Sequence, residues 1–159
     1  MAPIVLHYSN TTSSPIQKSI FKKLLTRTLE VLSKDRSFET SPFSGVLEVT
    51  IVNDAAICNI NKNHRHKNYP TDVISLSFLE GMAFPGKKKI LGEIYISVDT
   101  ARKQAKKQGY SLEQELHILF VHGLLHILGY DHEHGKKDAQ KMAKKEQQIL
   151  HGIKGLIAD

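Results

Sequence analysis

The sequence predicts a single α+β domain over residues 1–159, with a mixed sheet of about four strands packed against about five helices. Two observations support this fold class. Short segments of alternating or continuous apolar residues occur in mixed order with longer segments whose apolar residues recur at helical spacing. No internal repeat or low-complexity linker divides the chain, and 159 residues are enough to bury one core.

Local patterns place the individual elements. Strands are expected at residues 4–8, 47–51, 73–78 and 90–97. A first helix is expected from Ser14, a capping residue followed by proline at the first helical position, to about Leu32. Further helices are expected at residues 54–63, 98–108, 112–128 and 138–150. The helix that follows the capping serine Ser111 is apolar nearly all round, so it should be central and buried.

Charge and cysteine content restrict the class of protein. The formal net charge is +6, which favours a polyanionic partner, nucleic acid above all. The single cysteine, Cys58, excludes an internal disulfide and a cysteine-based zinc cage, and it suits a reducing compartment. The chain has neither a membrane-length apolar run nor a signal-peptide core. A cytoplasmic protein with no membrane partner is therefore expected.

The run HGLLHILGYDHEHG, from His122 to Gly135, predicts a metal site. His122 and His126 are four residues apart and therefore share one face of the predicted central helix. Gly129 can end that helix in a left-handed turn, which lets the chain double back and bring His132 to the same metal. Three neutral nitrogens and one open position are typical of a catalytic rather than a structural zinc site.

The same spacing occurs in metzincin proteases, whose pattern is H-E-x-x-H-x-x-G-x-x-H. Gly123 stands where the protease has the glutamate that acts as general base. A zinc site without that glutamate can still lower the pKa of bound water or polarise an oxygen, but its base must come from elsewhere. A metzincin-like metalloprotease is therefore the less favoured alternative.

Residues 122–132 closely resemble the signature of the YbeY family, bacterial endoribonucleases associated with ribosomal RNA maturation. Asn61, Arg65 and residues 71–75 resemble a second family motif, N-x-x-x-R followed by T-D-V-L-S. Residues 91–97 resemble the family's L-G-D-I-x-I-S strand, with Glu93 where aspartate is commoner. The resemblance extends over about residues 61–150.

The resemblance implies a single-strand-specific endoribonuclease that acts in 16S rRNA 3′-end maturation and ribosome quality control by metal-assisted phosphodiester hydrolysis. It implies that His122, His126 and His132 bind one Zn²⁺, with other divalent metals able to load in vitro. The candidate catalytic residues are His122 and Arg65, whose planar guanidinium matches two phosphate oxygens. Water and the RNA 2′-hydroxyl both stay open as the nucleophile.

The partners implied by the resemblance are ribosomal RNA and the small ribosomal subunit in the cytoplasm, with a small-subunit ribosomal protein and an Era-like GTPase as further candidates. An alternative of a different class is a ribosome-biogenesis RNA-binding factor in which the zinc is structural. The apparently open coordination position favours catalysis over that alternative.

Several carboxylates and cations outside the histidine run are also candidates. We hypothesise that Glu115 or Glu146 accepts a hydrogen bond from a buried partner, such as the second nitrogen of a ligand histidine. Asp72 is expected to accept backbone N–H bonds in the turn after Pro70. Two basic stripes and a basic loop patch would support binding to an RNA backbone if two of the three bordered the metal cleft: Arg102, Lys103, Lys106 and Lys107; Lys137, Lys141, Lys144 and Lys145; and residues 87–89.

Overall fold

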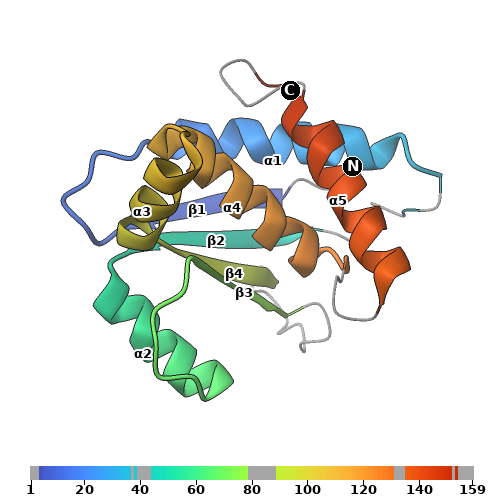
Figure 1. Cartoon of the computed structure of the whole chain (residues 1–159). Helices are drawn as coiled ribbons and strands as arrows, with labels where there is room; N and C mark the ends of the chain where they lie inside the picture. Colours follow the sequence, from blue (N-terminus) through green and yellow to red (C-terminus); the bar gives the residue numbers. More distant parts are fainter. Residues whose placement is uncertain are drawn as a thin grey trace.

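The computed structural model describes residues 4–36, 38, 44–78, 89–130, 135–151 and 153, which contain four strands and five helices (Figure 1). In chain order these are β1 (Ile4–Asn10), α1 (Lys18–Ser33), β2 (Gly45–Val52), α2 (Asp54–Arg65), β3 (Val73–Ser77), β4 (Ile90–Ser97), α3 (Val98–Gln108), α4 (Leu112–Ile127) and α5 (Lys136–His151). The predicted α+β class and the four strand positions are confirmed. None of the described helices is long and apolar enough to cross a membrane.

The sheet is mixed and has the strand order β1-β2-β4-β3. Strands β1, β2 and β4 are parallel, and β3 pairs with β4 in the antiparallel direction. Because neighbouring residues of a strand point to opposite faces, each face has its own set of side chains. Val73 packs against the main core, whereas the next residue, Ile74, belongs to a smaller apolar cluster. Both faces of the sheet are therefore partly covered.

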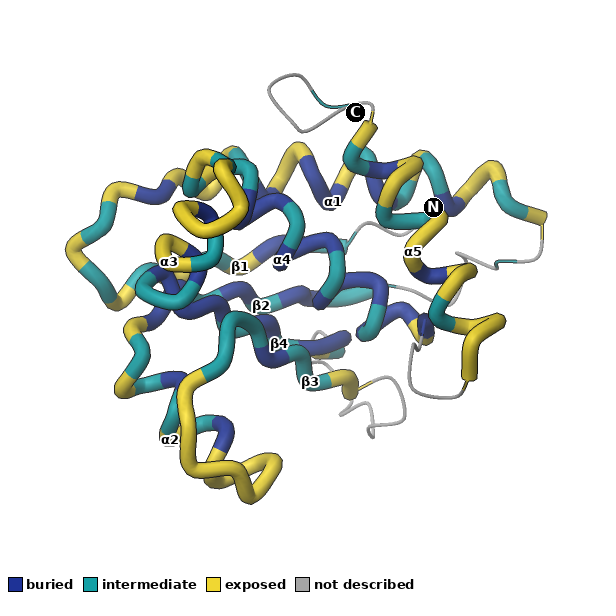
Figure 2. Tube along the Cα trace, viewed as in Figure 1, coloured by how far each residue is buried: buried dark blue, intermediate teal, exposed yellow. Residues whose placement is uncertain are grey.

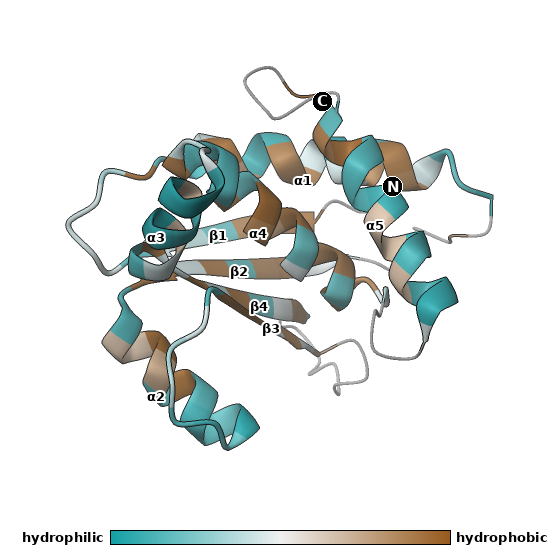
Figure 3. Ribbon diagram, viewed as in Figure 1, coloured by the Kyte–Doolittle hydropathy of each residue, from teal (hydrophilic) through white to brown (hydrophobic). Residues whose placement is uncertain are grey.

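The helices cover the two faces unequally. Side chains from α1, α3, α4 and α5 form the main core on one face, where the rings of Phe21 and Phe120 lie 5.2 Å apart. Helix α2 packs its Ile57 with Val52 and Ile74 in the smaller cluster, and Figure 1 shows α2 on the far side of the sheet from the other helices. Figure 2 shows the buried residues concentrated in the central strands and α4, which are also hydrophobic in Figure 3.

Both ends of α4 have the local signals that the sequence predicts. Ser111 accepts a hydrogen bond from the Gln114 backbone, and the Gln114 side chain accepts one from the Ser111 backbone, which completes a capping box. At the other end Gly129 has φ +104° and donates to the His126 carbonyl, while Tyr130 donates to the Leu125 carbonyl. These two bonds form a Schellman motif, so the chain turns away directly after the two histidines.

The predicted start of α1 at Ser14 is wrong, because α1 begins at Lys18 and its N-cap residue Gln17 makes no side-chain capping bond. Asn10 explains the difference. Its Oδ1 accepts from the backbone N–H and the hydroxyl of Thr12 at 2.9 and 2.7 Å, and its Nδ2 donates to the Ser14 carbonyl at 2.7 Å. Such side-chain bonds give the backbone an alternative to the helix, so the turn extends past the proline.

We expect Gly92→Ala to lower the free energy of unfolding by about 1–3 kcal/mol, because an added methyl overpacks this site. A Cβ at Gly92 would lie 2.6 Å from the Leu76 carbonyl oxygen and 2.7 Å from Ile127 Cδ1. Gly123→Ala is the matched control, because its Cβ would meet Ile94 at an ordinary 3.4 Å and alanine is the better helix former, by about 1 kcal/mol. Urea denaturation measures both; a Gly92→Ala variant as stable as the wild type would contradict this packing.

Candidate functional site

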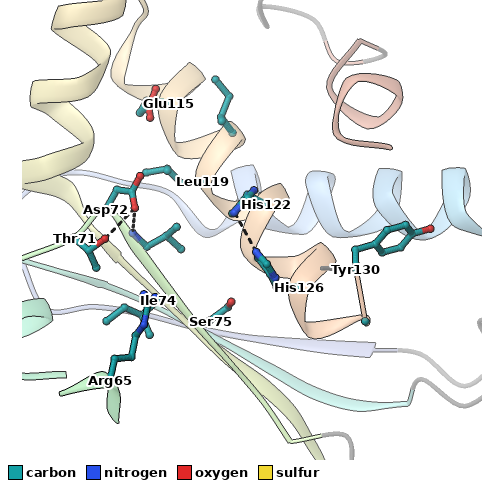
Figure 4. A pocket seen from close by; sticks show the side chains of 13 residues that line it. Arg65, Thr71, Asp72, Ile74, Ser75, Glu115, Leu119, His122, His126 and Tyr130 are labelled. Carbon is teal, nitrogen blue, oxygen red and sulfur yellow. Dashed lines mark hydrogen bonds between the residues drawn. The ribbon is translucent and has the colours of Figure 1, made fainter. Parts of the chain in front are cut away.

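A polar cleft of about 750 Å³ lies between α4, strand β3 and the end of α2 (Figure 4). Helix α4 contributes one wall, β3 and the residues before it contribute another, and Arg65 is the last residue of α2. The lining residues are Arg65, Thr71, Asp72, Val73, Ile74, Ser75, Glu115, Ile118, Leu119, His122, His126, Gly129 and Tyr130. The cleft therefore brings together two of the predicted metal ligands and the predicted phosphate-binding arginine.

The side chains of His122 and His126 face each other across one turn of α4 (Figure 4). Their Nε2 atoms are 3.2 Å apart, and their rings are close to perpendicular. Two nitrogens bound to one tetrahedral zinc at about 2.0–2.1 Å would be about 3.3 Å apart. The pair therefore fits two positions of a zinc shell. His132, the predicted third ligand, lies outside the described residues, so the three-histidine set stays a prediction.

Glu146 on α5 is hydrogen-bonded to Nδ1 of His122, the ring nitrogen that is not paired with His126. Its Oε1 lies 2.7 Å from His122 Nδ1. An ionised carboxylate only accepts, so His122 Nδ1 is the donor of this bond, and in the neutral tautomer that carries this hydrogen Nε2 is left as an acceptor next to His126. This arrangement, in which a carboxylate orients a histidine whose other nitrogen is available to a metal, is common in metal sites. The hypothesis that Glu115 or Glu146 accepts a hydrogen bond from a histidine nitrogen is confirmed for Glu146, although the two side chains of this pair are half-buried, and metal binding by His122 stays a prediction.

Arg65 reaches the cleft because α2 ends there. Asn53 caps the start of α2 by accepting from the Ala56 backbone, and His66 ends it with a left-handed φ of 58°. Asn61, fully buried, donates through Nδ2 to the Tyr69 carbonyl at 2.9 Å and thereby ties the following loop back to the helix. The Arg65 side chain itself is exposed, so its guanidinium is available to an anion that enters the cleft.

Asp72 and Glu115 line the cleft beside the histidines, and Gln104 of α3 joins them. With its amide nitrogen turned toward the cleft, Gln104 donates to Asp72 Oδ2 at 3.2 Å and to Glu115 Oε1 at 3.0 Å. The other oxygen of Asp72 accepts from the Val73 backbone at 2.7 Å and from the Thr71 hydroxyl at 3.3 Å. The expected turn role of Asp72 is thus confirmed.

Gln104 belongs to the part of the sequence that resembles the family, but sequence reasoning gave it no role in the site. A further signal is positional: Gln104 lies on α3 next to the buried Ala101 and Ala105, so a half-buried polar side chain interrupts an otherwise apolar stripe. A polar group in that position needs a partner, and here the partners are the two carboxylates of the cleft.

Neither basic stripe lines the cleft. In the first stripe, Lys103 pairs with Asp54 and Arg102 donates to the Ser14 hydroxyl. In the second, Lys145 pairs with Asp35 at 2.8 Å. Two of the three basic groups therefore do not line the cleft, so the condition set for RNA backbone binding is not met among the described residues. Residues 87–88 of the loop patch lie outside the described residues, and Arg65 is the described cation that lines the cleft.

The protease alternative receives no support from the geometry. A Cβ at Gly123 would point toward Ile94 and Val73 of the sheet, at 3.4 and 3.5 Å. A glutamate side chain at that position would enter the core instead of the cleft, so position 123 does not supply a counterpart of the protease general base.

The fold and the cleft define a single-domain α+β protein in which paired imidazoles from a core helix face a polar cleft with an arginine at its edge. The family model described as "Endoribonuclease YbeY" matches residues 7–154. The chain therefore belongs to the YbeY endoribonuclease family, whose named activity is that of a hydrolase acting on RNA. The predicted family resemblance is confirmed.

Individual relatives agree with the family match. The Endoribonuclease YbeY of Aquifex aeolicus is 48% identical over 104 residues, which cover 65% of this chain and 67% of the relative. That of Moorella thermoacetica is 40% identical over 138 residues, or 83% of this chain and 88% of the relative. The solution structure of TM1509 from Thermotoga maritima has a TM-score of 0.56 and 23% identity, covering 93% of this chain and 91% of that one. It supports the fold alone.

The Glu115 carboxyl should make stability depend on pH. Burial raises the pKa of Glu115 from its usual 4.5, and the charge of Asp72 raises it further. The folded state thus binds this proton more tightly than the unfolded state. Stability is lost as pH rises from about 4.5 through the folded pKa, and the loss persists at neutral pH.

Glu115→Gln is therefore expected to raise the melting temperature at pH 7, with the gain disappearing as pH falls below about 4.5. The variant amide oxygen can still accept from Gln104. Glu30→Gln, on the exposed side of α1, is the control and should leave the pH profile unchanged. Thermal denaturation across this pH range is the measurement, and a constant difference between Glu115→Gln and wild type would contradict the assignment.

Proposed function

We propose that this protein is a zinc-dependent, single-strand-specific endoribonuclease that acts on ribosomal RNA precursors. The observation that carries the proposal is that Arg65, His122 and His126 line the same cleft, with the Nε2 atoms of the two histidines 3.2 Å apart. Membership of the YbeY endoribonuclease family supports hydrolysis of RNA. Processing of the 16S rRNA 3′ end and ribosome quality control in the cytoplasm are the finer roles proposed, with the small ribosomal subunit, one of its proteins and an Era-like GTPase as partners.

The described donor set fits zinc. His122 and His126 would hold the ion together with His132, and Glu146 would keep His122 oriented. When bound, zinc supplies a Lewis acid that lowers the pKa of a water and withdraws charge from phosphate oxygens. Neutral imidazoles leave the full charge of the ion available for that purpose, unlike thiolate ligands.

The chain's own cations and shape account for binding of the substrate. Arg65 stays charged at any physiological pH, and its planar fork can contact two oxygens of the same phosphate. The cleft has a volume of about 750 Å³, which suits a few unpaired nucleotides. Single-stranded RNA fits such a site because its bases are free to turn away from one another.

Activity should depend on His126 and Arg65. On a ribosomal RNA precursor, His126→Ala and Arg65→Glu are each expected to reduce the cleavage rate by about a hundredfold or more. The controls are His7→Ala, at an exposed position on β1, and Lys62→Glu, at an exposed position on the same helix as Arg65. Metal content measured on the same samples should fall in His126→Ala alone. Equal cleavage by all variants would point to a contaminating nuclease and refute the proposal.

The same experiment tests the alternative of an RNA-binding factor with a structural zinc. In that case wild-type protein would bind the precursor without cleaving it, and His126→Ala would lose folding stability instead of turnover. Cleavage by the wild type that requires both residues would exclude that alternative.

Glu146 should matter for metal affinity even though it is not a ligand. Glu146→Gln keeps the size of the side chain but weakens its hold on His122 Nδ1, so zinc affinity is expected to fall about 10–100-fold. Competition with a chromophoric chelator measures this affinity. Glu30→Gln is the control for the loss of one surface carboxylate. Equal zinc affinity of Glu146→Gln and wild type would show that the hydrogen bond does not support the metal.

A further inference from the structure

The cleft contains two chemically different kinds of side chain. Arg65 is a cation and the histidine pair can hold the proposed metal, so both suit a phosphate, whereas Asp72 and Glu115 carry carboxyl groups. Figure 4 shows Glu115 further along α4 than the two histidines, toward the helix start, with Asp72 on the other side of the cleft. Two carboxylates are unsuited to bind a phosphate, but they are good acceptors for N–H groups, so this part of the cleft suits the base of a bound nucleotide.

We propose that Glu115 recognises the Watson–Crick edge of an unpaired guanine next to the phosphodiester that is cleaved, with Gln104 and Asp72 as positioning residues. This assignment rests on the proposed endoribonuclease function. It concerns the choice of RNA sequence, which neither the histidines nor Arg65 can make, because they face a phosphate that every nucleotide shares.

The position of Glu115 separates it from the reacting group. Glu115 precedes His122 by seven residues on α4, which is two helical turns or about 10 Å along the axis. Both residues line the same cleft, so they share one face of the helix. A phosphate held near the histidines would therefore leave Glu115 beside the neighbouring nucleotide instead of the scissile bond.

The hydrogen bonds around Glu115 determine which of its atoms can contact a ligand. Both oxygens of Asp72 already accept, from Gln104 on one side and from Val73 and Thr71 on the other. Gln104 also holds Glu115 Oε1 at 3.0 Å, which fixes the carboxyl in place. Among the described residues no hydrogen bond to Glu115 Oε2 is formed. Each carboxylate oxygen can accept two bonds, so Oε1 and Oε2 together can take two adjacent donors from a ligand.

Guanine fits this acceptor pair best. Its Watson–Crick edge presents the N1–H and N2–H groups side by side, whereas adenine and cytosine present one amino group next to an acceptor. The Glu115 side chain is also only slightly exposed, 6% for the residue, so water hydrates it poorly. Donors from a base would restore the hydrogen bonds that burial removes, and that gain makes the contact selective.

The test uses unstructured oligoribonucleotides that carry one guanosine in a uridine tract, with inosine or adenosine replacing it in matched strands. Inosine retains N1–H and differs from guanosine only by the missing 2-amino group. Wild-type protein is expected to cleave beside guanosine with a kcat/KM about tenfold above that for inosine. Glu115→Gln, which offers one acceptor and one donor, should reduce that ratio to about twofold or less.

Glu113→Gln is the matched control, because Glu113 is on the same helix but does not line this cleft, and it should keep the tenfold preference. Gln104→Leu should also weaken the preference, because it removes the donor that fixes Glu115 Oε1. Because the preference is a ratio between two strands cleaved by the same variant, a general loss of activity would leave it unchanged. Equal cleavage of guanosine and inosine strands by wild type, or an unchanged preference in Glu115→Gln, would overturn the assignment.

Binding measured by fluorescence anisotropy on the same strands separates this inference from the proposed function. If no strand is cleaved, the endoribonuclease proposal fails, and the binding ratio alone decides the role of Glu115. A guanosine-over-inosine binding preference that Glu115→Gln abolishes would still support it. Equal binding of the two strands by wild type would refute it.

Discussion

The packing of helix α4 against strands β3 and β4 sets the position of every polar group on the helical side of the cleft. Gly92 lies so close to Ile127 that a single methyl group has no room there, and Gly123 faces Ile94 of the sheet. The opposite side of α4 is anchored by the ring contact between Phe120 and Phe21 of α1. Since both sides are fixed by core packing, the histidines and Glu115 have little freedom to move relative to β3. A rigid core element is a suitable base for a site that needs defined distances.

The sequence predicts those parts of the structure that depend on neighbours in the chain. The Ser111 capping box and the glycine turn after α4 were predictable because each uses backbone groups only a few residues away. The start of α1 was not, because Asn10, outside the helix pattern, holds the chain in a turn. The bond between Glu146 and His122 could only be hypothesised, since helical spacing shows that a carboxylate is half-buried but not which element it meets.

The proximity of Arg65 to the histidine pair does not depend on neighbours in the chain. The residues belong to α2 and α4, which cover opposite faces of the sheet and approach each other only at its β3 edge. No periodicity in the sequence relates two such segments, so their proximity was expected through the family resemblance alone. The role of Gln104 was missed for the same reason: its two partners come from α4 and from the turn before β3, and neither is near it in the chain.

The carboxylates of Asp72 and Glu115 limit which part of the proposed RNA substrate can lie beside them. A phosphate 4 Å from a carboxylate is disfavoured by about 1 kcal/mol in bulk water and by about 4 kcal/mol at the effective dielectric of a protein surface. That penalty is at least as large as the energy of a typical hydrogen bond, about 1 kcal/mol, so a base is favoured over a phosphate at this part of the cleft. A base contact at Glu115 then has to discriminate only between nucleotides, which one or two hydrogen bonds can do.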